Sequence, residues 1–116
     1  MQTHKNLDVW KRSIDLVEVV YRTTRNFPED EKYLLTSQMR RAAISIPSNI
    51  AEGYARKSIK ELIQFLYTSL GSDSELETQT IIAQRLNYTD SVLIENIVEE
   101  VRRKLLNLIK YHYSKI

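Results

Sequence analysis

Apolar residues recur at alternating intervals of three and four residues in four separate segments of the chain. This spacing returns to one face of a helix on every turn, so each segment predicts an amphipathic α-helix. In the first segment the stripe consists of Leu7, Trp10, Ile14, Val17, Tyr21 and Thr24. It predicts a helix from about Asp8 to Asn26, with Asp8 as the N-cap and Pro28 beyond its end, because the residue before a proline avoids helical angles.

The second segment is predicted to start near Pro28, since proline fits the first turn of a helix and the acids at positions 29–31 favour its positive end. Its apolar stripe consists of Leu35, Met39, Ala43, Ile46, Ile50 and Gly53. Pro47 cannot donate a hydrogen bond to the carbonyl of Ala43, so we expect the helix to bend there. Two nearby serine hydroxyls are placed to satisfy part of the freed backbone.

The third segment starts at Ser58, which forms a capping box with Glu61, because each side chain can bind the other residue's backbone N–H. Its stripe consists of Ile59, Leu62, Leu66, Ser69, Asp73, Leu76, Thr80 and Ala83. The small and polar residues 71–75 also permit a loop between two short helices, with Ser74 and Glu77 as a second capping box. We favour one unbroken helix.

The fourth segment follows a turn at Asn87-Tyr88-Thr89 and is predicted to begin at an Asp90 cap. One of its faces carries Ile94, Ile97, Val101, Leu105, Leu108 and His112. Four helices with short connections favour an antiparallel, up-down four-helix bundle. The fold class is therefore predicted as all-α, and residues 1–116 as a single domain, which suits a chain of this length.

Composition argues against several classes of function. The chain has no cysteine, which removes disulfides, thiolate metal sites and thiol catalysis. His4 and His112 lie far apart and in no metal-ligand spacing, and the two glycines form no phosphate-binding loop. We therefore expect no metal, no cofactor and no enzymatic activity. No apolar run is long enough to span a membrane and the N-terminus does not resemble a signal peptide, so we expect a cytoplasmic protein.

The net charge of +2 is too small to indicate nucleic-acid binding by itself, but the bases are unevenly distributed along the chain. A local excess consists of Arg40, Arg41, Arg56, Lys57 and Lys60. Arginine forks match phosphate oxygens, so these five residues are candidates for contact with RNA or DNA. The alternative interpretation is an ordinary solvated surface.

A second group of polar residues has a structural interpretation. Glu52 and Arg56 are four residues apart in the order that favours an ion pair, and Arg41 lies on the same helical stripe. Asp73 and Glu77 fall on or beside the apolar stripe of the third helix, where a buried carboxylate needs a partner. The arginines of the second helix are candidates for that partner. We expect this polar network to be structural before it is functional.

Longer motifs connect the sequence with a known family. The run from Gln38 to Arg56, the segment Ser58-x-x-Glu61-Leu62-x-x-Phe65-Leu66 and the segment Gly71-Ser72-x-x-Glu75-Leu76-x-Thr78-Gln79 resemble the four-helix-bundle proteins encoded in intervening sequences of bacterial large-subunit (23S) rRNA genes. The resemblance covers nearly the whole chain. It implies an antiparallel bundle, an unbroken third helix, a ring-like homopentamer and no enzymatic activity.

A related branch of that family is similar to the accessory proteins of diversity-generating retroelements, which bind nucleic acid and a reverse transcriptase. Those proteins are strongly basic, whereas this chain carries only +2. The sequence thus favours a non-enzymatic homo-oligomer, with a pentamer as the best single expectation, that contacts RNA or DNA in a ribonucleoprotein. The alternative is a protein–protein adaptor or structural ring that has no nucleic-acid partner.

Overall fold

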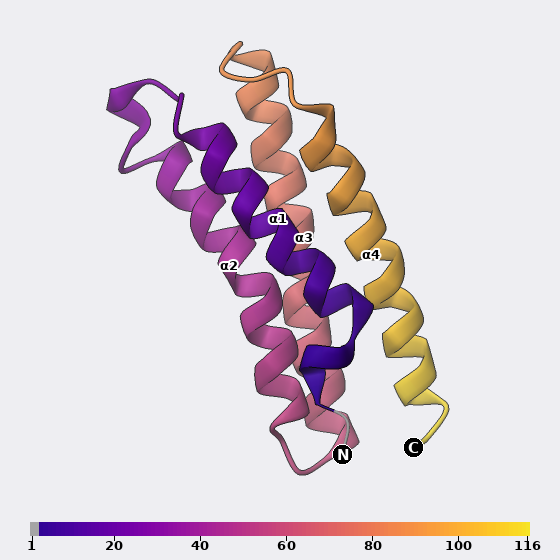
Figure 1. The fold of residues 1–116 in the computed structure, drawn as a ribbon. Coiled ribbons are helices and arrows are strands. Elements are labelled where there is room, and N and C mark those ends of the chain that lie inside the picture. The colour runs from indigo at the N-terminus through magenta and orange to yellow at the C-terminus, as the bar shows by residue number, and fades with distance from the viewer. Residues whose placement is uncertain (1–2) are drawn as a thin grey trace.

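The computed structural model describes residues 3–116, and within them the regular structure is entirely helical (Figure 1). The elements in chain order are the 3-10 turn η1 (His4–Asn6), helix α1 (Asp8–Thr24), the 3-10 turn η2 (Glu29–Glu31), and helices α2 (Leu35–Tyr54), α3 (Ile59–Arg85) and α4 (Val92–Tyr113). The predicted all-α fold of four helices is confirmed.

The four helices enclose one core. Helix α2 packs against α1 and α3, and α4 packs against α3 and α1. Figure 1 shows both chain ends and the α2–α3 connection at the same end of the elongated molecule, which measures 46 × 22 × 20 Å. We call this the terminal end, and the end with the α1–α2 and α3–α4 connections the distal end.

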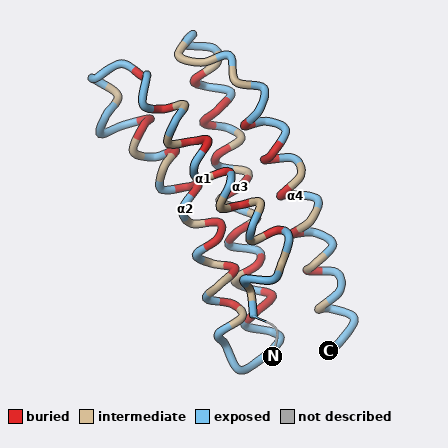
Figure 2. The backbone as a smooth tube through the Cα atoms, viewed as in Figure 1, coloured by how far each residue is buried: buried red, intermediate tan, exposed pale blue. Residues whose placement is uncertain are grey.

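The core lies along the inward faces of the helices, which are red in Figure 2. The whole predicted stripe of α2 is buried, from Leu35 to Gly53. The predicted stripe of α1 is rotated from the true one: Trp10, Ile14 and Val17 are only half-buried. Of the predicted residues, Thr24 lies on the buried face of α1, which otherwise carries Val9, Ser13, Leu16 and Val20. Sequence periodicity chose the wrong face because α1 is apolar on two adjacent faces.

Three helix starts differ from expectation. Asp8 is the first residue of α1 rather than its cap, and the cap residue Leu7 makes no side-chain hydrogen bond. Ser91 rather than Asp90 caps α4, since its hydroxyl accepts from the backbone N–H of Ile94 at 3.4 Å. The acids after Pro28 form only the η2 turn, because Leu34, with φ −117° and ψ −107°, interrupts the helical path before α2 begins.

The start and length of α3 agree with the sequence. The Ser58 hydroxyl accepts from the N–H of Glu61 at 3.1 Å, as the capping box requires. The helix continues through Gly71 without a break to Arg85, so the alternative of two short helices is wrong. Asn87 then adopts a positive φ of 62°, and the N–H of Tyr88 donates to the carbonyl of Ala83 at 2.9 Å, which closes the predicted turn.

Pro47 lies inside α2, which is continuous on both sides of it. The Ser48 hydroxyl donates to the carbonyl of Ile44 at 2.8 Å, and the Asn49 side-chain amide donates to the carbonyl of Ser45 at 2.8 Å. Side chains therefore bind the carbonyls beside the one that proline leaves without its usual donor, that of Ala43. The bend itself stays a prediction.

Small residues bring α2 and α3 close together along their length. The hydroxyls of Ser45 and Ser72 are 2.8 Å apart, and the Ser69 hydroxyl donates to the carbonyl of Ile46 at 2.9 Å. Toward the terminal end, a methyl group on Gly53 would lie 2.9 Å from Cβ of Phe65. We call this line of contacts the α2–α3 seam.

The two glycines give matched tests of the seam. Gly71→Ala meets no atom within 4 Å, so the better helix propensity of alanine should raise the free energy of unfolding by about 0.5–1 kcal/mol. Gly53→Ala gains the same propensity but overpacks the seam, so it should lower that free energy by about 1–2 kcal/mol. Urea unfolding followed by circular dichroism measures both, and equal effects would contradict the seam.

Candidate nucleic-acid interface

Basic residues gather at the terminal end. Residues 3–11, 50–66 and 105–116 hold seven lysines and arginines against three acids, whereas the rest of the chain holds ten bases against twelve acids. The seven bases are exposed: Lys5, Lys11, Arg56, Lys57, Lys60, Lys110 and Lys115. The net charge of +2 therefore combines a basic end with a slightly acidic remainder.

The five basic residues predicted as one cluster do not lie together. Arg56, Lys57 and Lys60 flank the α2–α3 connection at the terminal end. Arg41 lies 13 residues before Tyr54, the last residue of α2, which is about 20 Å along a helix axis. All five fall in one stretch of the sequence, but α2 holds the two ends of that stretch apart.

Arg40 holds α2 against α1 rather than facing solvent. Its Nε donates to the hydroxyl of Thr24 at 2.9 Å, and its guanidinium lies 4.5 Å from the centre of the Tyr21 ring. A half-buried cation with both a hydrogen-bond acceptor and an aromatic face is already well coordinated. Arg40 is therefore a packing residue and a poor candidate for phosphate contact.

The predicted polar network is two separate groups. Glu52 and Arg56 form an ion pair at 3.6 Å with about half of each side chain exposed, and such pairs contribute little to stability. Arg56 also lies over the Phe65 ring, at 4.9 Å from its centre. Arg41 joins neither contact. The side chain of Arg56 differs from that of Arg40 in its exposure: it is 43% exposed, so its guanidinium stays accessible beside these two contacts.

The second group is centred on Asp73, which is fully buried on α3. Neither carboxylate oxygen has a hydrogen-bond partner among the described residues. Burial raises the pKa of Asp73 from 3.8 to about 7; the charge of Arg102 acts in the opposite direction, and those of Glu77 and Glu99 add to the rise. The carboxyl group therefore holds its proton over much of the acidic pH range.

The partner predicted for these acids was wrong. Neither Arg40 nor Arg41 bonds to either acid. Arg102 on α4 binds Glu77 instead, with its Nη2 2.7 Å from Glu77 Oε1 and its Nη1 3.2 Å from the Ser74 hydroxyl, while Asp73 has no hydrogen-bond partner among the described residues. This contact could not be predicted from the pattern of residues, because Arg102 lies in a run of bases that resembles a solvated face.

Two further contacts were missed by sequence reasoning. Arg12 on α1 binds Glu100 on α4 at 2.9 Å and so connects the two helices, and Lys104, one turn further along α4, binds the same carboxylate at 3.2 Å. The Tyr54 hydroxyl and Nε2 of His112 are 2.8 Å apart. Burial raises the pKa of Tyr54 to about 12 and lowers the pKa of His112. Within residues 3–116 no cluster of histidines and acids is arranged to bind a metal ion.

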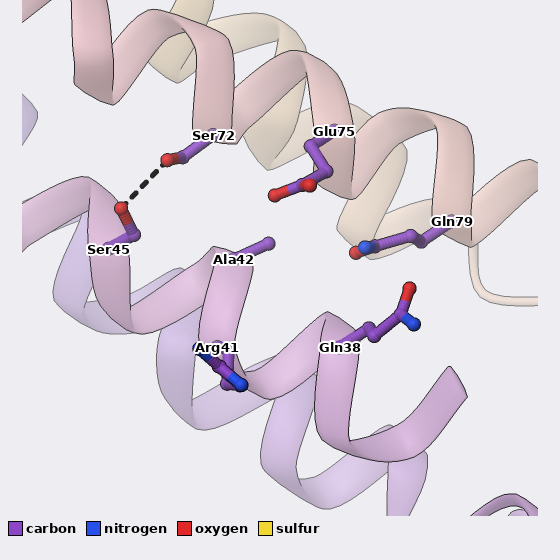
Figure 3. A pocket seen from close by; sticks show the side chains of 7 residues that line it. All are labelled: Gln38, Arg41, Ala42, Ser45, Ser72, Glu75 and Gln79. Atoms are coloured by element: carbon purple, nitrogen blue, oxygen red, sulfur yellow. Dashed lines mark hydrogen bonds between the residues drawn. The ribbon is translucent and has the colours of Figure 1, made fainter. Parts of the chain in front are cut away.

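A polar groove of about 310 Å³ runs between α2 and α3 (Figure 3). Gln38, Arg41, Ala42 and Ser45 line it from α2, at spacings that return to one helix face. From α3 it is lined by Ser72, Glu75 and Gln79. Figure 3 shows the Ser45–Ser72 hydrogen bond at one end, the two glutamines at the other, and Glu75 between them.

Most polar groups in this groove have no partner within the chain. Oε1 of Gln79 is buried and accepts no hydrogen bond from any described residue. Across residues 3–116, no side-chain hydrogen bond or ion pair involves the side chains of Gln38, Arg41 or Glu75. The side chains of Gln38, Arg41 and Glu75 are exposed, so they are open to a ligand. The buried oxygen of Gln79 is the unusual group, because native structures satisfy most of their buried polar groups.

These features define an all-α four-helix-bundle protein with a basic end and a polar groove between its second and third helices. The chain belongs to the family described as 23S rRNA-intervening sequence protein, whose profile matches residues 5–110. The resemblance noted from the motifs is thus confirmed. A comparison with curated proteins found no match. In the described part of the chain, no helix combines the length and hydrophobicity needed to cross a membrane.

The raised pKa of Asp73 predicts a pH-dependent stability. Between pH 3.8 and about 7 the folded chain holds a proton that the unfolded chain releases, so stability should fall as pH rises through this window. Asp73→Asn stays neutral and should lose this dependence, which amounts to about 4 kcal/mol at most. Urea unfolding at about pH 4 and about pH 8 measures the difference, with the exposed Asp90→Asn as the control.

Proposed function

We propose that this protein is a non-enzymatic, homo-oligomeric binding protein whose terminal end contacts the phosphates of RNA or DNA in a ribonucleoprotein. The observation that carries the proposal is the gathering of seven exposed bases against three acids at that end. Lysine and arginine side chains held on helix ends and a short connection attract a polyanion without sequence preference.

Oligomerisation would multiply this modest charge. A ring repeats one terminal end around its axis, so several weak phosphate contacts act together and raise avidity without new contacts in each subunit. The family resemblance implies a ring of five. A chain with a net charge of only +2 could in this way bind a long nucleic acid.

A half-buried apolar groove supports the homo-oligomer. The second apolar face of α1, with Trp10, Ile14 and Val17, meets Ile44 and Pro47 of α2 around a groove of about 310 Å³. The side chain of Ile44 is 41% exposed. A second copy of the chain would remove this apolar surface from water, which the single bundle does not do.

A protein adaptor is the second candidate function, favoured by a different surface. At the distal end, the last turns of α3 and the start of α4 expose large apolar side chains, which are Ile81, Ile82, Leu86, Val92 and Leu93. Exposed apolar side chains at one end of the bundle fit a protein partner better than a nucleic acid. In that case the terminal end would have no polyanionic ligand.

The nucleic-acid proposal predicts a charge-specific loss of binding. Replacing Arg56, Lys57 and Lys60 together by glutamine should weaken binding to single-stranded RNA and reduce the slope of log affinity against log salt by about 2–3. Fluorescence anisotropy at two salt concentrations measures this. The matched control replaces Arg22, Arg25 and Lys32, three exposed bases toward the distal end, and should change the slope little. If the two triple substitutions changed the salt dependence equally, the nucleic-acid proposal would be contradicted and the protein adaptor would be the favoured function.

The oligomer proposal predicts a mass that depends on the apolar groove. The wild-type protein should scatter light as a multimer, with five subunits expected, and Ile44→Glu should lower the mass by introducing a charge that is costly to bury. Leu93→Glu, an equivalent change at the exposed distal end, is the control and should keep the wild-type mass. A monomeric wild-type protein would remove the homo-oligomer from the proposal.

A further inference from the structure

The polar groove between α2 and α3 contains a set of hydrogen-bonding groups that nothing within the chain uses. Glu75 offers a carboxylate, Gln79 a buried carbonyl oxygen, and Arg41 a guanidinium, all at one groove. Figure 3 shows Glu75 and Gln79 side by side on α3, over the methyl group of Ala42 on α2. The groove therefore presents adjacent acceptors above a small apolar floor, and the cation of Arg41 lies across α2 from them, at the border of the same groove.

We propose that this groove binds an unpaired guanine base. Guanine is the base whose Watson–Crick edge places two donors next to each other, N1–H and the N2 amino group, beside the acceptor O6. The carboxylate of Glu75 can accept from both donors at once. A rotation of the Gln79 side chain, whose buried carbonyl has no hydrogen bond to lose, brings that oxygen to the second N2 hydrogen. The exposed Arg41 side chain swings over the groove to donate to O6.

The other bases complement the groove less well. Adenine and cytosine each offer one amino group beside a ring nitrogen that only accepts, and that nitrogen would face the Glu75 carboxylate without a proton. Uracil offers a single N–H between two carbonyl oxygens, which a carboxylate repels. Leaving groups unpaired in this way is what discriminates between ligands in a hydrogen-bonding site.

This inference rests on the proposed function, because it assigns a base-reading role to the strand that the terminal end holds by its phosphates. Arg41 lies about 20 Å along α2 from the end of that helix at Tyr54, so one single strand can contact the terminal end and place a base in the groove. The phosphate contacts would supply affinity and the groove would supply preference.

The experiment compares three uridine decamers whose central nucleotide is guanosine, inosine or adenosine. Inosine keeps N1–H and O6 and lacks only the N2 amino group. By fluorescence anisotropy, the wild-type protein should bind the guanosine decamer about tenfold more tightly than the adenosine decamer, with inosine between them. Glu75→Gln should bind all three alike, because an amide cannot accept from both donors. Titration with guanosine monophosphate tests whether the free base is taken without a strand.

Glu18→Gln is the matched control, since it removes the same charge from an exposed acid of α1 that lies away from the groove. Equal wild-type affinity for the three decamers, or the same behaviour of both variants, would overturn the guanine site while leaving phosphate binding in place. A changed mass of Glu75→Gln in light scattering would overturn it as well, by showing that a second copy fills the groove. If no decamer binds but the monophosphate binds through Glu75, the guanine site stands and the proposed function fails.

Discussion

The close approach of α2 and α3 is the constraint on which the rest of the structure depends. Ser45, Ser69, Ser72 and Gly53 are small enough for two long helices to touch through hydroxyls and backbone rather than through large side chains. The seam gains less from apolar burial than a leucine-rich contact would. It compensates with hydrogen bonds between the helices and with close packing.

The polar groove is a consequence of this seam. When two helices touch through small residues, the longer side chains one turn away cannot enter the contact and must stand at its edge. Gln38 and Arg41 on α2, and Glu75 and Gln79 on α3, are those side chains. On the other side of α3, the same helix turns Asp73 into the core toward the charge of Arg102 on α4. Helix α3 thus carries polar side chains at the groove and a buried acid within a few residues of each other.

Sequence patterns predicted the elements that a single strong signal determines. The capping box fixed the start of α3, and the unbroken stripe of α2 identified its buried face, because each depends on residues within one helix. The buried face of α1 was missed because a helix with two apolar faces gives two acceptable stripes. The partner of Glu77 was missed because Arg102 lies 25 residues away on another helix. Hydrophobic periodicity predicts which residues share one face of a helix, but it does not predict which faces of different helices pack together.

The candidate binding site shows the same limit in terms of charge. The small net charge does not reveal that bases and acids are unevenly distributed over the molecule. Seven of the bases lie at the terminal end because the chain starts there and returns to that end twice. Lys5, Lys57 and Lys110 are far apart in sequence and share the terminal end through topology alone. Conversely, Arg40 and Arg41 are neighbours in sequence with different roles, since consecutive residues on a helix point about 100° apart. One holds α1 against α2 and the other borders the groove, so a run of bases is informative only once the helix face of each is known.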